Sequence, residues 1–171
     1  MGALALMIQT LEINTHSAEE TQQIGRVLGQ LAQAGDLILL SGDLGAGKTT
    51  LTQGIAWGLG VEEYAHSPTF ILAHEYHGRV TLHHLDLYRI DNPREVEELG
   101  IDEFIADSVC VVEWAEKAID LFPEEHLLVE LTERGEESRS LRLSPAGERY
   151  VGLMEEIAKR LDGSRIEIKV D

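Results

Sequence analysis

Cysteine is nearly absent from this chain of 171 residues, since Cys110 is the only one. A single thiol excludes an internal disulfide and any zinc site built from several cysteines. No apolar run approaches the roughly 18 to 20 residues that a membrane span needs. The apolar opening segment has no basic region, so it indicates a strand and not a signal peptide. We therefore expect a protein of the reducing cytoplasm that does not associate with membranes.

Positive charge is also scarce. The 14 Lys and Arg residues face 31 Asp and Glu residues, which gives a net charge of −17. A chain this acidic is repelled by phosphate backbones unless its cations cluster, and its arginines are scattered along the sequence. We expect no autonomous binding of nucleic acid. Apolar residues make up 43% of the chain, which allows a real hydrophobic core.

The pattern of apolar residues predicts a mixed α/β fold. Two short, continuously apolar runs, 37–40 and 109–112, are typical of strands covered on both faces. Further periodic segments predict helices at 48–59 and 146–161, antiparallel hairpins at 69–76 with 80–88 and at 127–131 with 141–143, and a last strand at 165–170. Parallel and antiparallel strands are therefore both expected.

The most specific motif is a phosphate-binding loop at residues 42–49, which matches G-x-x-x-x-G-K-[ST] at every fixed position. Glycines let the backbone curl so that several N–H groups form an anion nest at the N-terminus of the next helix. The lysine meets the β- and γ-phosphates, and the threonine hydroxyl suits Mg²⁺. A chance match is expected in about 1% of such chains or fewer. The loop comprises Gly42, Asp43, Leu44, Gly45, Ala46, Gly47, Lys48 and Thr49.

A P-loop alone does not name a reaction. The chain lacks the Asn-Lys-x-Asp segment of guanine-specific GTPases and shows no arginine-rich lid of the kind that small-molecule kinases use. A compact ATPase is the preferred interpretation, and a free-standing P-loop kinase acting on a metabolite is the alternative. A nucleotide-gated binding module with negligible hydrolysis is a third hypothesis.

Magnesium at a P-loop needs a nearby carboxylate, and two candidates end apolar strands. Asp86 ends the run before Tyr88, and Glu113 ends the run 109–112. Either one holds the metal in this hypothesis, and the other orients the attacking water. Between them and the loop, Ser67 and Thr69 flank a proline in a segment suited to sensing the γ-phosphate.

Other conspicuous residues give weaker evidence of function. His83 and His84 are adjacent on a predicted strand, so they point to opposite faces and do not chelate a metal together. Cys110 lies inside an apolar run and is interpreted as a core residue. Trp114 follows Glu113 and either belongs to the core or covers the nucleotide.

Together these motifs resemble the TsaE family, formerly YjeE, the bacterial ATPases of tRNA threonylcarbamoyladenosine biosynthesis. The resemblance rests on order and spacing across residues 17–143, and the segments that carry it are 42–50, 67–69, 84–89, 98–100 and 112–114. It is far more specific than the P-loop alone. It implies a three-layer P-loop domain with a mixed sheet over 1–144. The helix and strand expected over 145–171 lie outside the resemblance and are interpreted as a C-terminal extension packed on the same domain.

The resemblance also implies a set of site residues and partners. The phosphates of ATP would be held by the loop from Asp43 to Thr49, with Thr50, Ser67 and Thr69 beside them. Mg²⁺ would be held by Thr49 and Glu113, with Asp86 near the metal or the attacking water. Arg139 resembles an arginine of the family that follows a glycine-containing turn. The partners would be TsaD and TsaB, whose threonylcarbamoyl-transfer cycle on adenosine 37 of tRNA is driven by ATP hydrolysis.

Overall fold

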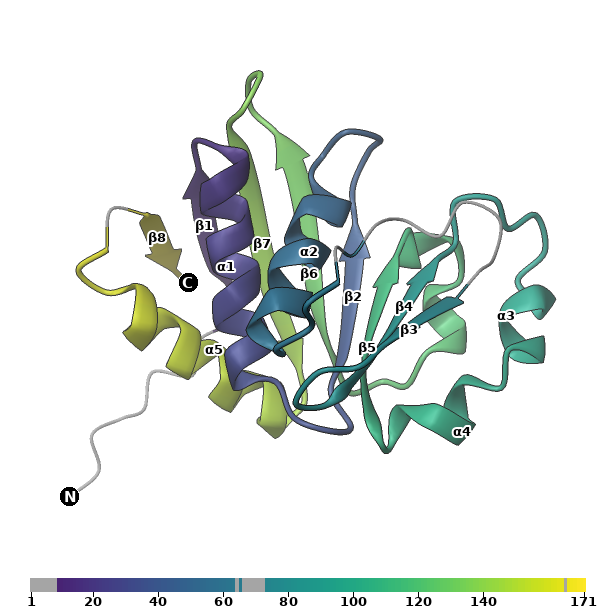
Figure 1. The fold of residues 1–171 in the computed structure, drawn as a ribbon. Helices are drawn as coiled ribbons and strands as arrows, with labels where there is room; N and C mark the ends of the chain where they lie inside the picture. The colour runs from purple at the N-terminus through teal and green to yellow at the C-terminus, as the bar shows by residue number, and fades with distance from the viewer. Residues whose placement is uncertain (1–8, 64, 66–72, 165) are drawn as a thin grey trace.

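The computed structural model describes residues 9–63, 65, 73–164 and 166–171, and Figure 1 shows their arrangement. The strands are β1 (Leu11–Thr15), β2 (Leu37–Ser41), β3 (Ala73–Tyr76), β4 (Thr81–Asp86), β5 (Ser108–Glu113), β6 (His126–Glu133), β7 (Arg139–Ala146) and β8 (Glu167–Val170). The helices are α1 (Ala18–Leu31), α2 (Lys48–Gly58), α3 (Arg94–Glu98), α4 (Ile101–Ile105) and α5 (Glu148–Leu161), with 3-10 turns η1 (Ala115–Lys117) and η2 (Ile119–Leu121).

All of these strands form a single sheet in the order β3-β4-β5-β2-β6-β7-β1-β8. The central strands β4, β5, β2 and β6 are parallel, and the flanking pairs are antiparallel. The apolar runs of β2 and β5 are buried, as expected for strands covered on both faces. The carboxyl ends of parallel strands share one edge, so Asp86 and Glu113 end beside the loop that follows β2.

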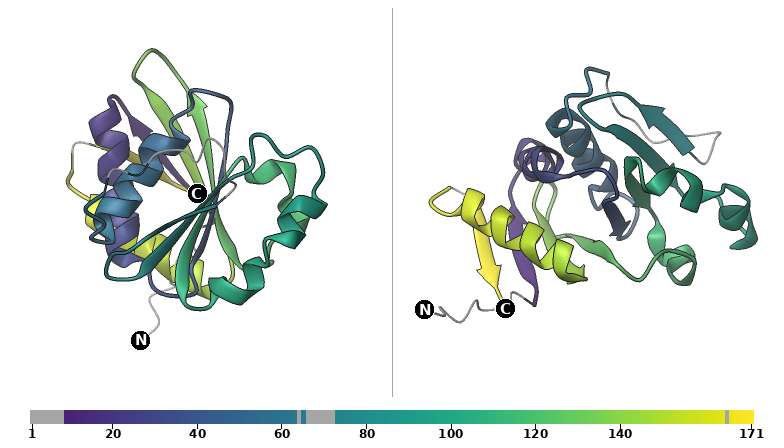
Figure 2. Two further views of the ribbon diagram at one scale, coloured as in Figure 1. Left: turned by 45° about the vertical axis from the view of Figure 1, so that its right-hand side comes forward. Right: turned by 90° about the horizontal axis from the view of Figure 1, so that it is seen from below.

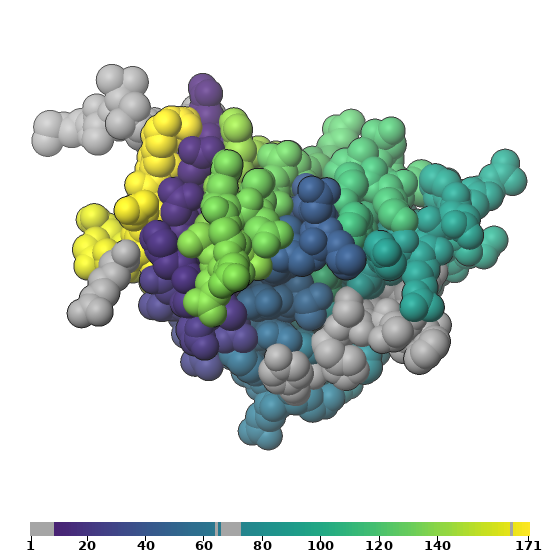
Figure 3. Space-filling model, turned by 90° about the horizontal axis from the view of Figure 1, so that it is seen from above, coloured from purple at the N-terminus to yellow at the C-terminus, as the bar shows by residue number. Residues whose placement is uncertain are grey.

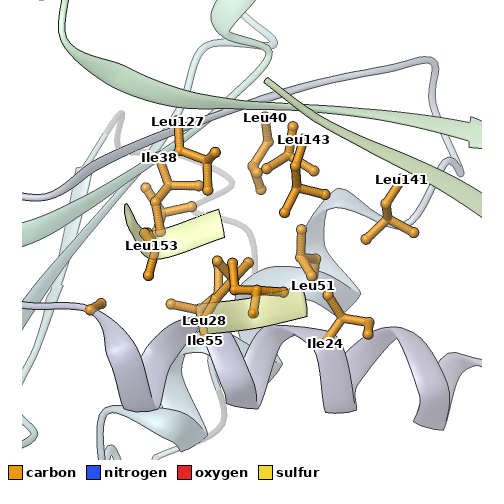
Figure 4. Close-up of a cluster of buried hydrophobic side chains, with 14 of the residues drawn as sticks. Ile24, Leu28, Ile38, Leu40, Leu51, Ile55, Leu127, Leu141, Leu143 and Leu153 are labelled. Carbon is orange, nitrogen blue, oxygen red and sulfur yellow. The ribbon is translucent and has the colours of Figure 1, made fainter. Parts of the chain in front are cut away.

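Helices cover both faces of the central strands and make three layers, as expected (Figure 2). On one face α1, α2 and α5 enclose the larger hydrophobic core. On the other face α3, α4 and the two 3-10 turns cover β4, β5 and β2 around Cys110 and Val112. Figure 4 shows the larger core, to which the helices and the sheet contribute Ile24, Leu28, Ile38, Leu40, Leu51, Ile55, Leu127, Leu141, Leu143 and Leu153.

Helices α1 and α2 approach each other through glycines spaced four residues apart. A Cβ at Gly25 would lie 2.8 Å from the Cα of Gly54, and one at Gly29 would lie 2.9 Å from the Cα of Gly58. Neither position has room for a side chain, so the two backbones lie in direct contact. This contact fixes α2, and with it the loop at its N-terminus, against α1.

The Ser17 side chain accepts a hydrogen bond from the Glu20 N–H and caps α1. The structure also confirms most of the local elements that the sequence predicts. Strands β6 and β7 form the expected antiparallel hairpin. Strands β3 and β4 form the other expected hairpin but are shorter than the runs 69–76 and 80–88, and residues 69–72 lie outside the described part of the chain.

The C-terminal segment packs on the same sheet. Arg149 at the start of α5 forms two hydrogen bonds with Asp36, at 3.0 and 2.7 Å, and the Tyr150 hydroxyl accepts one from the Leu37 N–H. Strand β8 pairs with β1. Because β7 runs across position 144, the division into 1–144 and 145–171 falls inside a strand, and it stays a prediction. No helix in the described part of the chain is both long and apolar enough to cross a membrane.

Candidate nucleotide site

The loop between β2 and α2 has the backbone that its glycines predict. Gly42, Gly45 and Gly47 have φ values of 141°, 83° and 103°, which side-chain-bearing residues rarely adopt. A Cβ at Gly42 would also lie 2.4 Å from the carbonyl oxygen of Leu131 on β6. From above, the loop (blue) lies at the surface beside the light green β6–β7 hairpin (Figure 3). The glycines therefore serve both the curl of the loop and its close approach to β6.

Lys48 folds back onto this loop. Its Nζ donates hydrogen bonds to the carbonyl oxygens of Gly42, at 2.5 Å, and Asp43, at 2.8 Å. Burial lowers the pKa of Lys48 from its usual value of 10.5, and the nearby carboxylates, Glu113 foremost, oppose that shift. The Lys48 ammonium group is therefore largely withdrawn from water, bonded to two backbone carbonyls and close to several carboxylates.

Glu113 lies at the centre of the group of polar side chains that faces Lys48. Its Oε1 accepts a hydrogen bond of 2.9 Å from the Thr49 hydroxyl, and its Oε2 contacts Nε2 of His84. Both Glu113 and His84 are buried. Asp86 pairs directly with Glu113 across β4 and β5, and its Oδ1 accepts the N–H of Tyr88 at 2.9 Å. Thr49 and the two strand-end carboxylates therefore lie together, as the sequence predicted.

Trp114 turns the chain over the site. Its φ is 60°, a left-handed backbone that is strained for an aromatic residue. In this conformation the indole lies 4.0 Å from the Lys48 ammonium and 5.0 Å from the Tyr88 ring. Lys117 donates a hydrogen bond to the Tyr88 carbonyl and lies over both rings. Trp114 is partly buried against the core around Cys110 and Val112 and also contacts Lys48, and its covering of a nucleotide stays a prediction.

On the opposite side of the loop is a hollow of about 310 Å³. It is lined by Ser41, Gly42, Asp43, Ala46, Glu130, Leu131, Thr132 and Glu133. Arg139 borders the same hairpin, and its Nε would lie 3.8 Å from a Cβ at Gly47. The Arg139 guanidinium donates hydrogen bonds to the carbonyls of its own turn, at Gly135, Glu136 and Ser138. Arg139 therefore lies beside the loop, but its guanidinium is hydrogen-bonded to the turn of the β6–β7 hairpin.

Most of the predicted site residues lie at this edge of the sheet. Thr50 occupies the first turn of α2, and Leu44 is 74% exposed at the tip of the loop. Ser67 and Thr69 lie outside the described residues, so their role stays a prediction. Sequence reasoning missed His84, which it considered only as a metal ligand paired with His83. The alternation of strand residues was the available signal, since His84 and Asp86 lie on one face of β4.

The residues fit a magnesium–nucleotide complex in their donor chemistry. Magnesium is usually held by one or two carboxylates together with substrate phosphates and waters, and not by a protein cage. The hydroxyl of Thr49 and the carboxylate of Glu113 are such oxygen donors, placed 2.9 Å apart. Within the described ranges no group of three or more His, Cys, Asp or Glu side chains forms a separate metal site. The positive-φ glycines and Lys48 supply the complementary half, a cradle for phosphate.

Comparison with known proteins agrees with this geometry. The tRNA threonylcarbamoyladenosine biosynthesis protein TsaE of Bacillus subtilis is 39% identical over 154 residues, which are 89% of this chain and 96% of that protein. The protein of the same name from Nostoc sp. is 41% identical over 143 residues, covering 80% and 87%. The crystal structure of Bacillus subtilis YdiB matches with a TM-score of 0.76 at 35% identity, over 91% of this chain and 99% of that one.

The family model covers most of the chain and includes every element of the site. The family model described as "Threonylcarbamoyl adenosine biosynthesis protein TsaE" matches residues 15–141, from the end of β1 to the middle of β7. That range contains the P-loop, both strand-end carboxylates, His84 and Arg139. The chain therefore belongs to the TsaE family.

Proposed function

We propose that this protein binds ATP and hydrolyses it in a magnesium-dependent reaction, as an accessory component of threonylcarbamoylation of adenosine 37 in tRNA. The observation that carries the proposal is the hydrogen bond between Thr49 and Glu113 at the end of a complete P-loop. This bond joins the loop's hydroxyl to the strand-end carboxylate, and these are the two oxygen donors that a magnesium–ATP site requires. The family of the chain supports the pathway.

Each residue has a distinct task in this proposal. The amides of residues 43–49 hold the phosphates, and Lys48 exchanges the carbonyls of Gly42 and Asp43 for phosphate oxygens. Thr49 and Glu113 would hold Mg²⁺, which would neutralise charge on the phosphates. Asp86, paired with Glu113, orients the attacking water or shares the metal's water shell.

The partners in the proposal are TsaD and TsaB, which would carry out the threonylcarbamoyl transfer and hold the tRNA. ATP hydrolysis by this chain would drive their cycle without chemistry on the tRNA itself. The acidic composition supports this division of labour, because a net charge of −17 disfavours direct contact with an RNA backbone.

The experiment is reconstitution of tRNA modification from purified TsaD and TsaB, a threonylcarbamoyl donor, tRNA and this chain. The Lys48→Ala variant is compared with Lys159→Ala, which makes the same change at a lysine 72% exposed on α5. We expect Lys48→Ala to lose ATP binding and modification while its circular dichroism is unchanged, and Lys159→Ala to behave as wild type. Modification that proceeds equally well with Lys48→Ala would contradict the proposal, and ATP-dependent phosphorylation of a metabolite by the isolated chain would favour a kinase.

A further inference from the structure

The carboxylate of Glu113 is fixed from two sides, and only one of them belongs to the nucleotide loop. Thr49 holds Oε1 from α2. His84 reaches Oε2 from the neighbouring strand β4 through its Nε2. Because β4 and β5 pair in parallel, with His84 opposite Val111 and Asp86 opposite Glu113, the His84 side chain lies on the α2-facing side next to Glu113.

The polar contacts of the imidazole are directed at this carboxylate. His84 is 0% exposed, and its Nδ1 has no hydrogen-bond partner among the described residues. A buried imidazole with an unpartnered nitrogen costs stability that an apolar residue at position 84 would not. The contact between Nε2 and Glu113 is the polar interaction that offsets this cost. Its target is the carboxylate that ends the central strand at the P-loop.

We infer that His84 is a positioning residue for Glu113. Its Nε2–H holds one carboxylate oxygen so that the other stays directed at Thr49 and the metal site. The inference rests on the proposed function and deepens it. Thr49 has a second task in the proposed site, since its hydroxyl also serves the metal, whereas His84 lies within β4 and directs its contact at Glu113. His84 therefore keeps Glu113 in one orientation, as partners of metal-ligating carboxylates do.

The matched variants are His84→Gln and His84→Asn, which are both polar amides. The Gln amide nitrogen reaches the position of Nε2, whereas the Asn amide reaches only that of Nδ1, which faces away from Glu113. The probe is Mn²⁺ titrated into the ADP complex and followed by electron paramagnetic resonance. We expect His84→Asn to weaken Mn²⁺ binding on the order of 10- to 100-fold, and His84→Gln to stay within about threefold of wild type.

Affinity for ADP in the presence of EDTA should change little in either variant, because the phosphate cradle does not include His84. Equal Mn²⁺ affinity in wild type and His84→Asn would overturn the inference, as would an equal loss in both variants. A wild-type chain that binds no ADP would instead overturn the proposed function, and the inference with it.

A measurement on the wild type covers the case in which His84→Asn does not fold. Long-range ¹⁵N NMR is expected to show a slowly exchanging proton on Nε2 of His84, with a chemical shift that moves when Mg²⁺ is added to the ADP complex. A rapidly exchanging proton, or a signal indifferent to Mg²⁺, would contradict the role of His84.

Discussion

Lys48 folds back onto the P-loop, and its contacts explain how the loop keeps its shape. An ammonium group that is withdrawn from water must satisfy its N–H donors, and here the Gly42 and Asp43 carbonyls accept two of them. The indole of Trp114 at 4.0 Å adds a cation–π contact. Phosphate oxygens would offer Lys48 a stronger partner than these carbonyls, because they carry charge. The carbonyls of the loop therefore hold the Lys48 ammonium in place, and phosphate oxygens would replace them as its partners.

Cys110 provides a prediction at the level of a single residue. It is completely buried in β5 and its pKa is raised to about 12, because burial disfavours the thiolate. We expect the native protein to resist alkylation by iodoacetamide at pH 8, and the urea-unfolded protein to react at the rate of a free cysteine. Mass spectrometry after timed quenching gives both rates. Rapid labelling of the native chain would show that the strand opens or that the thiol is accessible.

The raised pKa of Cys110 also has a consequence for stability. Folded Cys110 keeps its proton to a higher pH than the unfolded chain does, whose thiol titrates near 9.0. Its burial therefore stabilises the fold fully below pH 9, and this contribution is lost as pH rises from 9 towards 12. Urea unfolding curves recorded between pH 7 and pH 10 test the sign, and we expect the Cys110 contribution to the free energy of unfolding to fall as pH rises above 9.

The sequence alone predicts the positions of some site residues and not of others. The P-loop and Glu113 were predictable because a local pattern or a strand end defines each one. Trp114 was not, because its left-handed φ of 60° sends the indole over Lys48 against the usual preference of an aromatic residue. His84 was not either, because its contact with Glu113 depends on the register between β4 and β5. Residues 67 and 69 stay predictions.

At the level of elements, the glycine contact between α1 and α2 decides where the P-loop helix lies. A Cβ at Gly29 would approach the carbonyl oxygen of Ile55 to 2.1 Å, and the clash is with backbone that cannot rotate away. The helices would have to separate, which would shift α2 and the loop that begins it. Packing of the core therefore affects the candidate site, because α2 belongs to the core and begins at the P-loop.

Gly29→Ala is therefore expected to destabilise the protein by about 1 to 3 kcal/mol or more, and to weaken ATP binding. The control is Gly152→Ala, in the middle of α5, where a Cβ would meet nothing within 4 Å. That substitution should stabilise by about 0.5 to 1 kcal/mol, because alanine is the better helix former. Urea unfolding gives both values. Equal effects of the two substitutions would mean that the α1–α2 contact is not tight.

The sequence predicted elements better than their arrangement. Continuous apolar runs identified β2 and β5, and alternating runs identified the β6–β7 hairpin. No local pattern indicated that β1 pairs with β7 and β8, because strands far apart in sequence are joined by shape and register. The close contact between α1 and α2 was also not predicted. Helix prediction relies on the spacing of apolar residues, whereas this contact is made by the backbone at glycines.

The whole molecule is acidic even where it carries arginines. Arg142 on β7 lies between Glu130 on β6 and Glu12 on β1, which are its direct neighbours in the sheet. Arg149 at the start of α5 forms an ion pair with Asp36. Cations balanced by carboxylates in this manner do not form a patch that could hold a phosphate backbone.

We accordingly expect the isolated chain not to retain tRNA at physiological salt, since a net charge of −17 opposes the backbone. A filter-binding titration of the isolated chain with labelled tRNA measures this. Binding of tRNA by the chain alone at sub-micromolar concentration would contradict this expectation.

The final prediction concerns the molecule and its partners together: the isolated chain should hydrolyse ATP slowly, and TsaD–TsaB should accelerate it. A transferring phosphoryl group needs positive charge beyond one lysine, and an arginine supplied in cis or in trans raises rates on the order of 10³- to 10⁵-fold in P-loop enzymes. Arg139 lies beside Gly47, but its guanidinium is bonded to three carbonyls of its own turn. A partner can supply the missing charge directly or by releasing Arg139 from the hairpin.

Phosphate release by the wild type and by Arg139→Ala, with and without the pair, separates these routes. Stimulation that survives in Arg139→Ala indicates a cation from the partner, and stimulation that disappears indicates Arg139 itself. In both cases the acceleration should weaken as salt rises, because an acidic chain that meets a more basic partner is steered by charge. Equal rates per molecule with and without TsaD–TsaB would mean that the site is already complete in the isolated chain, with Lys48 as a sufficient source of positive charge.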